Sequence, residues 1–150
     1  MSAAPGVTIE RVDHIGIRVR DLDRALAFYG VLGFELHHKV TFDAVAIIKN
    51  RAGVEINLII NASDGDPGKN ILMDVPEKYA GYTHVALRVA SIADTLAALR
   101  AHEVKITQGP VKFGEDGGVS VFIRDPDRNV IELRGADAKG VAGVTQYEPG

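Results

Sequence analysis

The chain has 150 residues, of which 46% are hydrophobic and 25% are charged, a composition that is ordinary for a globular protein with a substantial core. The formal net charge is −3 without blocks of like charge, and cysteine is absent, which argues against a nucleic-acid partner and excludes disulfides and thiolate chemistry. The segment MSAAPGVTIE lacks the features of a secretory signal, and no apolar run reaches the roughly 20 residues of a membrane helix. We therefore expect a cytoplasmic protein that makes no contact with a membrane.

The first part of the chain predicts a strand, a helix and three further strands. The segment VDHIGIRV (12–19) alternates polar and apolar residues as a strand does, and Asp21 can cap a helix whose apolar residues recur at helical spacing. Three strand-like runs follow at 34–42, 44–50 and 54–60.

The same order returns in the second part of the chain. YTHVALRV (82–89) repeats VDHIGIRV, with identical pairs His14/His84 and Arg18/Arg88. Ser91 with an acid three residues later is a capping-box signal for a second helix. A strand near 104–107, a Gly/Pro-rich loop over 109–118, and strands over 119–125 and 129–135 complete the repeat.

The duplication predicts an α+β fold of two βαβββ modules in tandem. They are expected to form a cupped, mostly antiparallel sheet with the helices on its outer face. The modules are assigned to residues 9–61 and 81–135, with a turn-rich linker over 62–80. An N-terminal extension (1–8) and a Gly/Ala-rich tail (136–150), for which we expect no regular structure, flank them.

Alternation along the strands predicts a polar face opposite the helices. His14 and His84 lie on that face, together with small residues, and Glu132 joins them because Ile131 and Leu133 face the core. A carboxylate in mid-strand is costly unless it is paired or binds a cation. Two imidazoles and one carboxylate suit a divalent ion such as Fe, Mn, Ni, Co or Zn. His14, His84 and Glu132 are therefore candidate metal ligands, and a metal-free His–Glu hydrogen bond is the competing interpretation.

The other three histidines are expected to be structural. His37 and His38 are adjacent and so point to opposite faces of a strand. His102 lies at the end of the second predicted helix, where a positive charge suits the helix dipole.

Four segments resemble the vicinal-oxygen-chelate superfamily: VDHIGIRVRDLDRALAFYGVLGFEL, YTHVALRV, GPVKFG and FIRDPDRNVIELRG. This superfamily contains glyoxalase I, extradiol dioxygenases, methylmalonyl-CoA epimerase and the fosfomycin- and bleomycin-resistance proteins. The resemblance covers residues 9–135 and implies a cupped sheet that is commonly completed by homodimerisation. It also implies a divalent metal, held by His14, His84 and Glu132, that chelates a small substrate through two vicinal oxygens.

The chain departs from the family's pattern at the last strand of the first module. The slot that corresponds to Glu132 holds Asn57, which cannot act as a general base, although its amide can bind a metal weakly or contact substrate. Glu55 lies two residues away on the same face. Glu132 and Glu55 are therefore the candidates for the catalytic carboxylate, and Asn57 is a candidate substrate contact.

Further substrate contacts are predicted around this face. Lys112 lies in the glyoxalase-like segment GPVKFG and could meet an anionic group. Phe122 and Arg124 share a strand face, although a turn or dimer role suits Arg124 equally well. Phe42 and Phe113 are candidates for additional apolar wall.

Three classes of function remain open at this point. The first is a metal-dependent lyase or isomerase, or a ring-cleaving dioxygenase, acting on a small oxygenated substrate. The second is a metal-free binding or antibiotic-sequestration protein of the bleomycin-resistance type, against which the three retained ligand residues count. The third is a fosfomycin-modifying transferase, a group that usually carries extra basic residues and a potassium-binding loop. We expect a homodimeric enzyme of the first class.

Overall fold

The computed structural model describes residues 6–64 and 68–149, which form two modules with the same order of elements. The first module contains β1 (Ile15–Arg18), α1 (Leu22–Val31), β2 (Glu35–Lys39), β3 (Val45–Lys49) and β4 (Glu55–Ile59). The second contains β5 (His84–Arg88), α2 (Ile92–Ala101), β6 (Ile106–Lys112), β7 (Val119–Arg124) and β8 (Val130–Gly135), and β9 (Thr145–Gln146) follows it. The predicted α+β class and the duplicated order are confirmed.

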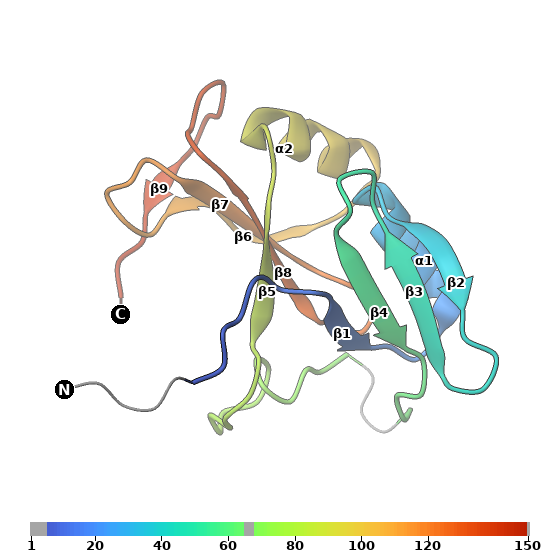
Figure 1. The fold of residues 1–150 in the computed structure, drawn as a ribbon. Coiled ribbons are helices and arrows are strands. Elements are labelled where there is room, and N and C mark those ends of the chain that lie inside the picture. Colours follow the sequence, from blue (N-terminus) through green and yellow to red (C-terminus); the bar gives the residue numbers. More distant parts are fainter. Residues whose placement is uncertain (1–5, 65–67, 150) are drawn as a thin grey trace.

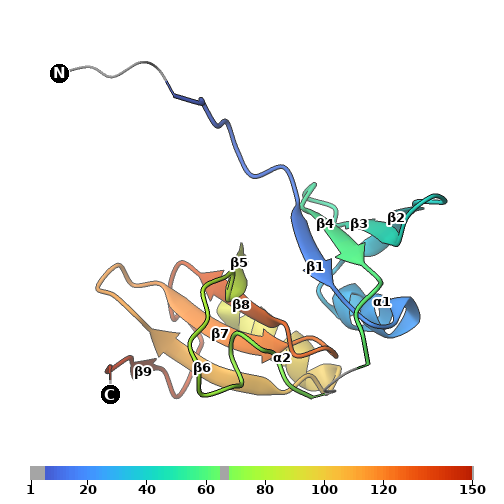
Figure 2. The same cartoon turned by 90° about the horizontal axis from the view of Figure 1, so that it is seen from below.

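Each module forms its own sheet, with strand orders β1-β4-β3-β2 and β5-β8-β7-β6-β9. The first and last strands of each βαβββ unit pair in parallel, β1 with β4 and β5 with β8, and the pairs within each β-meander are antiparallel. Figure 2 shows the modules side by side. In the described parts of the chain no strand of one module pairs with a strand of the other, so each module contributes its own sheet to the predicted fold.

Strand β6 and the C-terminal tail differ from the prediction. The segment expected to be a loop over 109–118 contributes its first four residues to β6, with register shifts in the pairing to β7. Gly109 has φ +98°, and a Cβ there would collide with the Ser120 carbonyl oxygen, so this glycine serves close strand packing rather than a loop. In the tail, β9 pairs in parallel with β6, which widens the second sheet.

The two helices begin as predicted and help to enclose a common core. Asp21 and Ser91 cap α1 and α2 by accepting a hydrogen bond from the N–H three residues along, at 2.7 and 3.1 Å. Neither helix is long and apolar enough to span a membrane. A single hydrophobic cluster draws on both modules, and its largest fully buried side chains are Tyr29, Ile48, Ile56, Leu58, Leu99, Ile123 and Ile131. Burial of these side chains fixes which face of each sheet remains for polar residues. Figure 1 shows α1 behind the strands of the first sheet.

The turn between β7 and β8 joins the second module to the first. The buried Tyr29 hydroxyl donates to Oδ2 of Asp125 at 2.8 Å. The Asp127 carboxylate accepts from Arg20 at 3.1 Å and from Arg24 at 2.7 Å. Burial, and then the charge of Asp125, raises the pKa of Tyr29, so the tyrosine remains a protonated donor. These contacts orient α1 against the second module.

Asp74 fastens the segment between the modules to the same turn. Its carboxylate accepts from Arg128 at 2.8 and 3.1 Å, from Arg124 at 3.0 and 3.1 Å, and from the Asn70 N–H at 2.7 Å. The hydrogen bond from Arg128, with those from Arg124 and Asn70, holds the pKa of Asp74 well below its usual range. The linker is therefore anchored through a charged contact whose strength depends on the ionised carboxylate.

Replacing Tyr29 by phenylalanine should lower the free energy of unfolding by about 1–3 kcal/mol, because the buried Asp125 carboxylate loses its hydroxyl donor. Urea unfolding monitored by circular dichroism measures the change. The control is Tyr82→Phe, which removes a hydroxyl from a fully exposed ring and should change stability by less than about 0.5 kcal/mol. Equal stability of both variants would contradict the role assigned to the Tyr29–Asp125 bond.

Asp74 should also make the free energy of unfolding depend on pH in the acidic range. Because its pKa is lowered in the folded protein, this carboxylate contributes stability that is complete above about pH 4, the ordinary range of Asp, and is lost as pH falls toward the folded pKa. In Asp74→Asn the fall in unfolding free energy below about pH 4 should be shallower, by up to roughly 1.4 kcal/mol per pH unit. Urea unfolding at several acidic pH values checks this, and parallel curves for the two proteins would refute it.

Candidate functional site

His84 and Glu132 meet on the face of the second sheet that points away from the core. The parallel register sets Ala86 beside Glu132, and His84 lies two residues before Ala86 on the same face. Nε2 of His84 is 3.2 Å from Oε1 of Glu132. Glu132 is only 8% exposed, whereas the His84 side chain is 38% exposed. The structure therefore brings together these two of the predicted ligands, with the imidazole between a buried carboxylate and solvent.

The second oxygen of Glu132 is also engaged. The hydroxyl of Ser120, on the neighbouring strand β7, donates to Oε2 of Glu132 at 2.6 Å. Arg134 donates to the Ser120 oxygen at 3.1 Å and to Asp116 at 2.8 Å. Sequence reasoning assigned no role to Ser120, although its alternation with Phe122 places it on the polar face.

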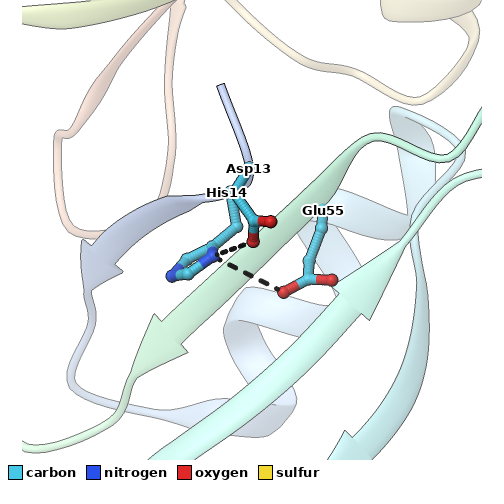
Figure 3. A group of neighbouring side chains, drawn as sticks. All are labelled: Asp13, His14 and Glu55. Atoms are coloured by element: carbon cyan, nitrogen blue, oxygen red, sulfur yellow. Dashed lines mark hydrogen bonds and ion pairs between the residues drawn. The ribbon is translucent and has the colours of Figure 1, made fainter. Parts of the chain in front are cut away.

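His14 belongs to a second cluster, in the first module. The strand expected over 12–19 begins at Ile15, so His14 lies just before β1. Its Nδ1 is 2.7 Å from Oδ1 of Asp13 and 3.9 Å from Oε2 of Glu55, and Figure 3 shows this one edge of the imidazole facing both carboxylates. The hydrogen bond with His14 lowers the pKa of the exposed Asp13. Asp13 was not predicted as a site residue, and its position next to His14 is the signal that could have found it.

Asn57 occupies the position in the first module that Glu132 occupies in the second. The register sets it beside Gly16, as Glu132 is set beside Ala86. Its Oδ1 is buried and has no hydrogen-bond partner among the described residues. A buried amide oxygen without a partner is unfavourable, and a cation or a ligand donor at this place would satisfy it.

The candidate ligands thus form two groups in one chain. Ligand atoms of Asp13, His14 and Glu55 lie within 4.8 Å of one another, and residues 6–64 and 68–149 contain no other such group of three. His14 therefore does not join His84 and Glu132 within a single chain. Their joint ligation stays a prediction, and it requires a second chain to bring a first-module group to a second-module group.

A row of aromatic rings leads away from His84. The ring centroids of His84 and Phe122 are 5.9 Å apart, those of Phe122 and Phe113 are 5.8 Å apart, and those of Phe113 and Tyr147 are 4.9 Å apart. Tyr147 comes from the tail, for which no structure was expected. Phe42, predicted as part of the same wall, is 90% exposed between β2 and β3 and is not in this row.

Arg124 and Lys112, which were predicted to contact substrate, have surroundings in the structure that do not support this role. The Arg124 guanidinium donates to the Arg128 carbonyl oxygen at 2.9 Å, which supports the turn role weighed for this residue, and it also binds the Asp74 carboxylate. Lys112 alternates with Val111 and Phe113, which places it on the sheet face opposite the aromatic row. A substrate role for either residue stays a prediction without support from this geometry. His102, expected to be structural, is the C-cap residue of α2.

Comparison with known proteins agrees with this arrangement. The family model of the Glyoxalase/Bleomycin resistance protein/Dioxygenase superfamily matches residues 11–133. Lactoylglutathione lyase of Haemophilus influenzae is 33% identical over 130 residues, which cover 80% of this chain and 88% of that protein. The glyoxalase domain-containing protein RDO1 of Mycosarcoma maydis is 29% identical over 129 residues, covering 85% of this chain and 69% of that protein.

The fold is also found in solved structures. A crystal structure of a glyoxalase/dioxygenase from Nostoc punctiforme has a TM-score of 0.67 at 22% identity, and the match covers 89% of this chain and 99% of that one. Family match, duplicated modules and fold agree. The chain therefore belongs to the Glyoxalase/Bleomycin resistance protein/Dioxygenase superfamily.

Proposed function

We propose that the protein is a divalent-metal-dependent lyase or isomerase of the glyoxalase type, acting on a small substrate with vicinal oxygens. The observation that carries the proposal is the pair formed by His84 Nε2 and the buried Glu132 Oε1 at 3.2 Å, on a face that an aromatic row borders. Similarity to a lactoylglutathione lyase at 33% identity supports lyase chemistry. Lactoylglutathione, a thioester, is therefore the first substrate to test.

The donor atoms fit a divalent first-row cation. His84 and His14 offer imidazole nitrogens, Glu132 offers a buried carboxylate oxygen, and the unpartnered Oδ1 of Asn57 offers a neutral oxygen. This mixture of nitrogen and oxygen donors suits Fe, Mn, Ni, Co or Zn. A cation held there would polarise a carbonyl and stabilise negative charge that develops on adjacent oxygens.

The active form that we propose is a homodimer. One chain keeps His14 in one cluster and His84 in another, and their side chains are 43% and 38% exposed, so both remain accessible. A second copy can bring the first-module cluster of one chain to the second-module cluster of the other. Two equivalent sites per dimer follow from two-fold symmetry.

We assign proton transfer to Glu55. Glu132 is held by Ser120 and His84, whereas the Glu55 side chain is 21% exposed and makes looser contacts, with Oε2 3.9 Å from His14 and Oε1 3.5 Å from Lys49. A general base must reach the substrate proton and return it, so it needs this freedom. Asn57, one step along the same face, can orient the substrate through its amide.

Removing either member of the His84–Glu132 pair should abolish tight metal uptake. Protein purified without chelator should contain one metal per chain by elemental analysis. His84→Ala and Glu132→Ala should each bind cobalt more weakly by more than the roughly 10–100-fold that loss of an outer-shell partner costs, measured by isothermal titration calorimetry.

His102→Ala is the matched control, because His102 ends α2 and should leave uptake unchanged. Equal loss in all three variants would refute the site. The metal also separates the classes of function: nickel, cobalt or zinc supports isomerisation, stoichiometric iron supports ring-cleaving oxygenation, and protein without any metal supports sequestration.

Glu55→Gln should lower kcat with lactoylglutathione as substrate by about 100–10,000-fold, because the amide cannot accept the substrate proton. Thioester absorbance follows the reaction. Metal content should be unchanged in this variant. Glu35→Gln, on the exposed strand β2, is the control and should keep wild-type kcat. Full activity of Glu55→Gln would remove this residue from catalysis.

A further inference from the structure

We propose that Ser120 and Arg134 form a positioning relay that fixes the Glu132 carboxylate, and that Asp116 ties this relay to the loop between β6 and β7. Four side chains make the chain of contacts: Glu132 accepts from Ser120 at 2.6 Å, Ser120 accepts from Arg134 at 3.1 Å, and Arg134 donates to Asp116 at 2.8 Å. The effect of the relay on metal binding rests on the proposed function, whereas the hydrogen bonds themselves do not.

Chemistry fixes the direction of every bond in the relay. Arginine has donors only, so Nη1 of Arg134 must donate to the Ser120 oxygen. The single hydroxyl proton of Ser120 is then free to point at Oε2 of Glu132, and 2.6 Å is within the range of a hydroxyl donating to a carboxylate. Ser120 is fully buried, so solvent water does not replace it.

The consequence for Glu132 is that its two oxygens become different. Oε2 is occupied by Ser120, and Oε1 is left 3.2 Å from Nε2 of His84. The carboxylate is held in one orientation before any cation arrives. Outer-shell partners of this kind orient ligands and typically contribute 10–100-fold to metal affinity.

The first module supplies an internal comparison. Pairing of β3 with β4 sets Val45 opposite Ile59, and the corresponding pairing of β7 with β8 sets Ser120 opposite Arg134. Two apolar residues thus stand at the relay positions of the module whose ligand slot holds Asn57 rather than an acid. Ser120 and Arg134 therefore occur in the module that has the acid Glu132 and are absent from the equivalent positions of the module that lacks it. This distribution is expected if their role is to hold the carboxylate.

The relay ends in the loop that follows β6. Asp116 accepts from the Gly118 N–H at 3.0 Å as well as from Arg134, and a Cβ on Gly118 would collide with the Arg134 guanidinium. The loop backbone and Arg134 therefore fit together closely. The Asp116 side chain is 65% exposed, so its contribution should be weaker than that of the buried Ser120.

The first measurement uses the metal-free protein. Nitrogen and proton signals of the histidine rings are recorded by NMR at fixed pH for wild type and Ser120→Ala. Loss of the hydroxyl frees Glu132 to rotate, so the His84 ring signals should shift while those of His14, in the other cluster, should not. Unchanged His84 signals would overturn the relay.

The second measurement is cobalt affinity of the full chain by titration calorimetry. Ser120→Ala should bind cobalt about 10–100-fold more weakly, Ser120→Thr should restore affinity to within about threefold because it keeps the hydroxyl, and Asp116→Asn should have a smaller effect than Ser120→Ala. Val45→Ala, the equivalent truncation in the first module, is the matched control and should stay within about threefold of wild type.

Each outcome decides something. Wild-type affinity in Ser120→Ala, or equal losses in Ser120→Ala and Val45→Ala, would overturn the positioning role. Failure of the wild-type protein to bind cobalt or other divalent ions would overturn the proposed function instead, and the histidine ring signals of the metal-free protein would then decide the relay on their own.

Discussion

The parallel pairing of the first and last strands of each module is the constraint on which the candidate site depends. In the second module it sets Ala86 beside Glu132, and because side chains alternate along a strand, His84 and Glu132 project from one face while the core takes the other. In the first module the same pairing sets Gly16 beside Asn57. The small residues at these two positions leave the surface of the strand open, so neighbouring donor atoms can converge on a ligand.

Asp125 and Glu132, two buried carboxylates in the second module, both carry the free-energy cost of burying a charge but have different surroundings. Asp125 is 3% exposed and accepts hydrogen bonds from Tyr29, from the Asn129 side chain and from two backbone N–H groups, so both of its oxygens are engaged at the junction between the modules. Burial still raises the pKa of Asp125 in spite of these hydrogen bonds. Glu132 is 8% exposed, but only Oε2 has a fixed hydroxyl partner, and Oε1 faces an accessible imidazole. Under the proposed function, Oε1 of Glu132 is the oxygen that would bind the cation, beside the accessible imidazole.

Features that depend on residues close together in the sequence were predicted correctly. The repeat, the caps Asp21 and Ser91, and the common face of His84 and Glu132 all follow from spacing along the chain. The bond between Arg124 and Asp74 joins residues 50 apart in sequence, and no local pattern announces it. Similarly, Gly109 favours a loop by its residue type, yet pairing with β7 makes it part of a strand. At Gly109, long-range strand pairing overrides the local preference.

The modules differ in a way that suggests a division of labour. Glu55 occupies the position that corresponds to Val130, which pairs with His84 in the second module. Asn57 occupies the position that corresponds to Glu132. The acid of the second module is buried and fixed, whereas the acid of the first is partly exposed and loosely held. A metal ligand gains from being held in one orientation, but a proton carrier must move between donor and acceptor. Under the proposed function, the acid shifted by two residues between the modules gives one carboxylate a fixed position for metal ligation and the other the mobility for proton transfer.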